Sequence, residues 1–94
     1  MDSDETVIKK ALQRSQEPTT SGDALRVLGN AYTRRTRTEP SADKKAKYRL
    51  ILRAVAKHPN TPTKTLRYLA HQSAILPYVR ENPNYTIAIL EKEA

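Results

Sequence analysis

Prolines recur along this chain at a fixed distance from leucines, and this spacing constrains the fold more than any other feature. Three prolines are each followed by a leucine seven residues later: Pro18 by Leu25, Pro59 by Leu66 and Pro83 by Leu90. Pro59 and Pro83 are 24 residues apart, whereas Pro18 and Pro59 are 41 apart, with 17 extra residues between them. A proline stops a helix at or before the preceding residue. The pattern therefore predicts helices separated by proline turns and stacked as repeats, because units of this size bury their apolar faces against their neighbours.

Apolar periodicity predicts five to six helices and an all-α fold, since two glycines are few for a β-rich fold of tight turns. The expected helices begin near Ser3, Asp23, Ser41, Thr61, Ser73 and Tyr85. Residues 30–43 place three arginines in four positions among threonines and before a proline, so we expect an exposed loop there. The whole chain, 1–94, is predicted to be one domain, with flexible segments at 1–5 and roughly 31–42.

The most complete turn reads His58-Pro59-Asn60-Thr61-Pro62 and is followed by Leu66, Leu69 and Ala70. This segment resembles the leucine-rich repeat variant family, whose units centre on an Asn-Pro-Asn-Thr-Pro turn and a leucine-bearing helix. Residues 48–72 match best, and the turns at Pro18 and Pro83 are degenerate copies that have Ser21 and Thr86 in place of the second proline. The resemblance implies a short right-handed α/α superhelix, related to HEAT and armadillo repeats, that alternates α-helices with short 3₁₀ helices.

The turn positions themselves are expected to be structural. His58 occupies the same variable position as Glu17 and Asn82, and we expect it to be exposed. We expect Asn60 and Asn84 to satisfy local backbone groups, as asparagine does at turns.

Positive charge is concentrated in the middle of the chain. The net charge is +7, and residues 26–67 carry twelve basic and two acidic side chains, a local excess of +10. On a helix starting near Ser41, four of the basic residues fall at i, i+4, i+8 and i+12 and predict one continuous solvated ridge. The ridge, the arginines of the expected loop and the basic residues at the start of this helix are the candidate binding residues: Arg34, Arg35, Arg37, Lys44, Lys45, Lys47, Arg49, Arg53 and Lys57.

A cationic ridge of this kind predicts binding to a polyanion. We favour a small nucleic-acid-binding accessory protein that contacts DNA or RNA phosphates, because the charge is concentrated and arginine-rich. The alternative is a helical-repeat adaptor that binds an acidic protein. Tyr32, Tyr48 and Tyr68 are candidates for stacking on unpaired bases, although tyrosine at helical spacing more often packs in the core.

Catalysis has little support in this sequence. No cysteine is present, and His58 and His71 lack any partner spacing typical of a metal site, so we expect no enzyme, no metal and no cofactor. No apolar run is long enough to span a bilayer, and the acidic start of the chain is unlike a signal peptide, which favours the cytoplasm. Two and a half to three repeat units are few for a solenoid, so we also expect that two copies pair through an exposed end.

Overall fold

The chain folds into helices that break at the prolines. The computed structural model describes residues 4–93, and the side chains of residues 4–90; the expected start of the first helix at Ser3 lies outside these residues. The described residues form six helices and no strand: α1 (Asp4–Gln16), α2 (Gly22–Thr38), α3 (Ala42–Lys57), α4 (Thr63–Leu69), α5 (Leu76–Glu81) and α6 (Pro83–Glu93). The predicted all-α class and the number of helices are confirmed. None of the helices in this part of the chain has the length and apolar character that crossing a bilayer requires.

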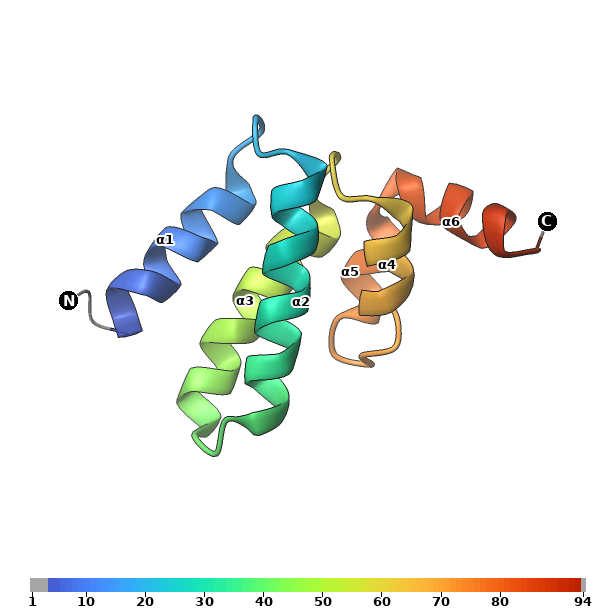
Figure 1. The fold of residues 1–94 in the computed structure, drawn as a ribbon. Helices are drawn as coiled ribbons and strands as arrows, with labels where there is room; N and C mark the ends of the chain where they lie inside the picture. Colours follow the sequence, from blue (N-terminus) through green and yellow to red (C-terminus); the bar gives the residue numbers. More distant parts are fainter. Residues whose placement is uncertain (1–3, 94) are drawn as a thin grey trace.

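The core lies along the antiparallel pair α2 and α3, at the centre of an elongated body (Figure 1). Helix α1 covers one side of this pair, α4 and α5 cover the other, and α6 packs on α4 and α5. The largest side chains of the core have no exposed surface, and they come from the α2–α3 pair and from the α4–α5 side: Leu25, Ile51, Leu52, Val55, Leu66, Leu69, Ile75 and Val79. The leucines at the seventh position after Pro18 and Pro59 are thus core residues. Leu90, the third, is 60% exposed.

The predicted loop at residues 30–43 is wrong, because α2 continues to Thr38 and only three residues join it to α3. Burial explains the longer helix: the ring of Tyr32 lies 5.5 Å from the ring of Tyr48 on α3, and Thr33 is also buried. The Thr36 hydroxyl donates to the Tyr32 carbonyl at 2.7 Å, so a threonine that favours loops is accommodated within the helix.

Helix boundaries differ from the expected ones at two caps. The N-cap of α2 is Ser21, whose Oγ accepts from the Ala24 N–H at 3.2 Å, rather than Asp23. Thr61 does not cap α4: it is buried, and its hydroxyl donates to the Val55 carbonyl at 2.5 Å, near the end of α3. This hydroxyl therefore ties the turn to the preceding helix instead of starting the next one.

Hydrogen bonds join the successive proline turns. The Asn60 Nδ2 donates to the carbonyls of Pro18 and Thr20 at 3.1 and 3.0 Å, and the Asn84 Nδ2 donates to the Pro59 carbonyl at 2.8 Å. These asparagines therefore satisfy backbone groups, as expected, but the groups belong to the preceding turn and not to their own. The donor–acceptor separations of 42 and 25 residues are each one more than the proline spacing.

His58 is buried between turns, which corrects the expectation that it is exposed. Its Nε2 lies 2.6 Å from the Glu17 carbonyl oxygen, and its Nδ1 lies 3.0 Å from the Asn60 backbone nitrogen. A backbone N–H is a donor, so Nδ1 accepts and Nε2 carries the proton. The imidazole therefore links two turns through hydrogen bonds at both ring nitrogens. The sequence did not predict this, because a polar residue beside a turn is usually exposed.

Candidate polyanion-binding surface

The predicted basic residues gather on one projecting hairpin. Helix α2 ends with Arg34, Arg35 and Arg37, and α3 starts with Lys44, Lys45 and Lys47, so the short connection at 39–41 brings both sets to the same tip. Figure 1 shows this end of α2 and α3 extending beyond the other helices. The structure then divides the candidate residues between two sides of the hairpin.

Two of the lysines on the side facing α1 are neutralised. The Lys44 Nζ lies 3.4 Å from Asp4 Oδ2, and the Lys47 Nζ lies 3.2 Å from Glu5 Oε1. The side-chain hydrogen bond with Asp4 raises the pKa of Lys44, with a smaller contribution from Glu39. The sequence contains no acidic residues interleaved with these lysines, but the fold supplies them from about forty positions earlier.

Two contacts identify the opposite side of the hairpin. On α2, the Thr33 hydroxyl accepts from the Gln72 Nε2 at 2.8 Å, which places this face of α2 against the turn between α4 and α5. On α3, the Arg53 guanidinium carbon lies 4.9 Å from the centre of the Tyr78 ring on α5. Residues three or four positions apart share a helix face, so the residues one turn away from Thr33 and Arg53 also lie on this side.

These residues are Arg37, one turn after Thr33, and Arg49, one turn before Arg53. Lys45 lies one turn before Arg49 in the same row of α3. None of the three forms an ion pair with any acidic side chain that the structure describes. We call the unpaired set, together with the two cations that continue it toward α5, the basic face: Arg37, Lys45, Arg49, Arg53 and Lys57. The basic face is the side of the predicted surface on which no cation has an acidic partner among the described residues.

The α5 end of the basic face also has a structural role. Arg53 and Lys57 both approach the face of the Tyr78 ring, at 4.9 and 5.4 Å. Arg53 is half-buried, and its Nε has no hydrogen-bond partner among the described residues. The ridge is therefore not solvated along its whole length as predicted, because its second half packs on α5 through cation–π contacts.

The tyrosines on the hairpin are structural as well. Tyr32 and Tyr48 are buried, which excludes them as platforms for bases, and Tyr68 is half-buried. Burial raises the pKa of Tyr32, against an opposing effect of Arg35, whose guanidinium lies 5.2 Å from the ring centre. Arg35 is thus held against its own helix, while Arg34 is exposed at the hairpin tip.

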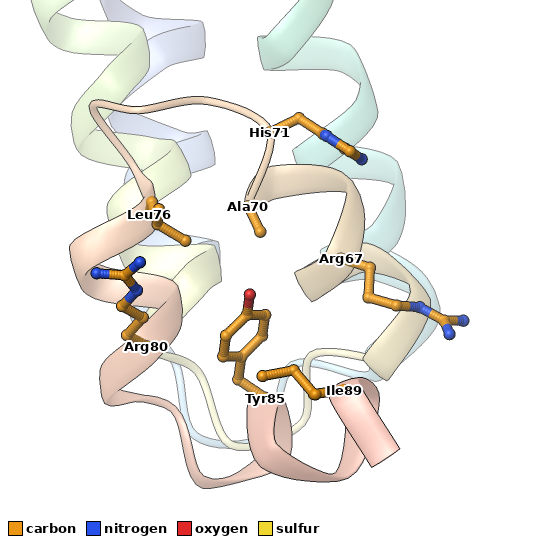
Figure 2. Close-up of a pocket in the computed structure, with 7 residues that line it drawn as sticks. All are labelled: Arg67, Ala70, His71, Leu76, Arg80, Tyr85 and Ile89. Atoms are coloured by element: carbon orange, nitrogen blue, oxygen red, sulfur yellow. The ribbon is translucent and has the colours of Figure 1, made fainter. Parts of the chain in front are cut away.

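A second cationic region, which sequence reasoning missed, lies between α4, α5 and α6. Its pocket has a volume of about 510 Å³ and is lined by Arg67, Ala70, His71, Leu76, Arg80, Tyr85 and Ile89 (Figure 2). The lining residues are scattered over 23 positions, so only the packing of three short helices brings them together. No group of three or more His, Asp or Glu side chains within the described residues is arranged to hold a metal ion.

Comparison with protein-family models, with curated proteins and with solved structures finds no match to this chain.

Proposed function

We propose that this protein is a non-catalytic binding module that contacts the phosphates of a nucleic acid through the basic face. The observation that carries the proposal is the difference in ion pairing between the two sides of the hairpin. Lys44 and Lys47 are paired with Asp4 and Glu5, whereas Arg37, Lys45 and Arg49 on the other side have no acidic partner among the described residues.

Unpaired cations on one face carry an electrostatic cost that binding recovers. Arg49 and Arg53, and Lys45 and Arg49, are like-charged pairs at i,i+4, which destabilise an isolated helix by about 0.2–0.5 kcal/mol each. A polyanion removes this repulsion and releases its own condensed counterions. The basic face therefore favours a partner with regularly spaced negative charges, which nucleic acids provide.

The module that presents this face is proposed to be a helical repeat of the leucine-rich repeat variant type. Two features support the repeat: the turn-to-turn hydrogen bonds follow the spacing of the prolines, and the hydroxyls of Thr20 and Thr61 both donate to the carbonyl six residues earlier. In this view the 17 extra residues between the first two units lengthen α2 and α3 into the projecting hairpin. The insertion is what adds the basic face to an otherwise ordinary stack.

Fluorescence anisotropy with labelled mixed-sequence DNA and RNA at about 50 mM salt tests the proposal. The informative variant is the triple substitution Arg37→Gln, Lys45→Gln and Arg49→Gln. Its matched control is Lys9→Gln, Arg14→Gln and Lys64→Gln, which removes the same charge from three exposed positions outside the basic face. We expect the first variant to lose at least about tenfold in affinity and the control less than about threefold, since each lost phosphate contact weakens binding. Equal losses of affinity in the two variants contradict binding through the basic face. If the protein binds an acidic protein but neither DNA nor RNA, the partner is an acidic protein and the nucleic-acid proposal is wrong.

A further inference from the structure

The pocket between α4, α5 and α6 combines an apolar floor with cations at two rims. Ala70, Leu76, Ile89 and the ring of Tyr85 provide the floor, and no acidic side chain is among the seven described residues that line it. Figure 2 shows the Arg67 and Arg80 side chains on opposite sides of Tyr85, each with its guanidinium directed away from the pocket centre. The two arginines therefore flank the pocket and do not converge on one point inside it.

This arrangement suits a ligand with an apolar group between two negative charges. A single anion in the pocket would need both guanidiniums to turn inward, whereas a chain crossing from one rim to the other meets a cation on each side. Single-stranded nucleic acid has this chemistry, because flat bases with π-faces alternate with phosphates along the strand. Duplex DNA does not offer it, since its bases are stacked inside the helix.

The pocket also continues the basic face. The turn between α4 and α5 contributes Ala70 and His71 to the pocket, and the Gln72 of the same turn donates to Thr33 on α2, the residue one turn before Arg37. One strand can thus lie along the basic face, cross this turn and reach the pocket. We propose that the pocket receives one unpaired base of a single strand, with the neighbouring phosphates on Arg67 and Arg80. The inference rests on the proposed function and specifies its ligand as single-stranded.

Two exposed isoleucines on α6 make a matched test. Ile89 lines the pocket and is 40% exposed, while Ile87 is 49% exposed and is not among the lining residues. Ile89→Glu and Ile87→Glu bring the same charge to the same helix. We expect Ile89→Glu to weaken binding of a labelled twelve-nucleotide thymidine strand about five- to tenfold, and Ile87→Glu less than about twofold, because only the first puts a carboxylate where the base stacks. Neither variant is expected to change the affinity for a duplex by more than about twofold.

An abasic strand of the same length checks that the base is what the pocket binds. The wild-type protein is expected to bind it about five- to tenfold more weakly than the thymidine strand, and Ile89→Glu is expected to bind both strands with equal affinity. Circular dichroism of both variants confirms that they remain helical. Equal binding of abasic and thymidine strands by the wild type, or equal losses in the two isoleucine variants, overturns the pocket while the basic face stands. If the wild-type protein binds no nucleic acid at all, both the pocket and the basic face are overturned.

Discussion

His58 and Asn82 make the same two kinds of hydrogen bond in successive turns of the chain. The Nδ1 of His58 accepts from the Asn60 N–H at 3.0 Å, and the Oδ1 of Asn82 accepts from the Asn84 N–H at 2.9 Å. The Nε2 of His58 then reaches the Glu17 carbonyl at 2.6 Å, and the Nδ2 of Asn82 donates to the His58 carbonyl at 2.9 Å. An imidazole and a carboxamide thus serve one purpose, which is to close a turn and attach it to the one before.

This equivalence predicts that His58→Asn retains most of the stability that His58→Ala loses. Alanine leaves the Asn60 N–H without its acceptor, at about 1–3 kcal/mol for an unsatisfied group, and removes one of the two donors to the Glu17 carbonyl, which keeps the Thr20 N–H. The free energy of unfolding, measured by urea denaturation at neutral pH, is therefore expected to fall by about 2–4 kcal/mol in His58→Ala and by less than half of that in His58→Asn. Equal losses in the two variants would show that the ring contributes through its volume instead.

Gly22→Ala is expected to destabilise the protein even though alanine favours helices. A Cβ at this position, the first residue of α2, lies 2.8 Å from the backbone oxygen of Asn60, which cannot move aside like a side chain. Overpacking of this kind costs about 1–3 kcal/mol, more than the gain of roughly 1 kcal/mol in helix propensity. The control is Thr19→Ala, at an exposed position in the adjoining turn. A melting temperature raised by Gly22→Ala contradicts the close approach of the two turns.

The two arginines of the ridge are expected to differ in stability effects. Arg53 packs on Tyr78, and its buried Nε has no partner among the described residues. Arg53→Met, which keeps the apolar stem, is therefore expected to be neutral or slightly stabilising. Arg53→Ala removes the packing and is expected to cost about 1–2 kcal/mol in the free energy of unfolding. Arg49→Ala, one turn earlier, is expected to change this free energy by less than about 0.5 kcal/mol. Thermal denaturation of the three variants distinguishes them. A large loss of stability in Arg49→Ala contradicts its placement on the part of the basic face that does not pack on α5.

Neutralising the α1 carboxylates is expected to increase affinity for a polyanion without changing stability. Asp4→Asn and Glu5→Gln free Lys44 and Lys47, and exposed ion pairs contribute little to folding. The double variant is expected to bind mixed-sequence DNA about two- to fourfold more tightly at low salt, because the local field becomes more positive. Its melting temperature is expected to match the wild type. The control is Asp23→Asn, whose partner Arg26 lies on α2 away from the hairpin tip, and an equal gain there would show an effect of total charge alone.

The helices were predictable from sequence where prolines determine them. Pro18, Pro40, Pro59 and Pro83 each lie at or beside a helix end that the structure confirms. The continuation of α2 to Thr38 was not predictable, because the Arg-Thr stretch has weak helix propensity and is stabilised by the contact of Tyr32 with Tyr48 on another helix. Local signals decide where a helix stops, and tertiary contacts decide how far an ambiguous segment continues.

The candidate site was predictable as a set of residues but not as a surface. The i,i+4 spacing places Lys45, Arg49 and Arg53 on one face of α3, which is helical throughout this stretch. Whether each cation has a partner depends on residues far away in sequence. Asp4 pairs with Lys44 from 40 positions earlier, and the Tyr78 ring lies against Arg53. No pattern within the hairpin sequence contains that information.

The central claim is that the basic face neutralises phosphates, and the salt dependence of DNA affinity tests it most directly. With four to five contacts, the plot of log affinity against log salt concentration is expected to have a slope of about −4 for a duplex. The variant lacking Arg37, Lys45 and Arg49 is expected to reduce that slope to about −1.3, because three contacts of about 0.9 each are lost. A slope near zero in the wild-type protein, or the same slope in both proteins, contradicts the account.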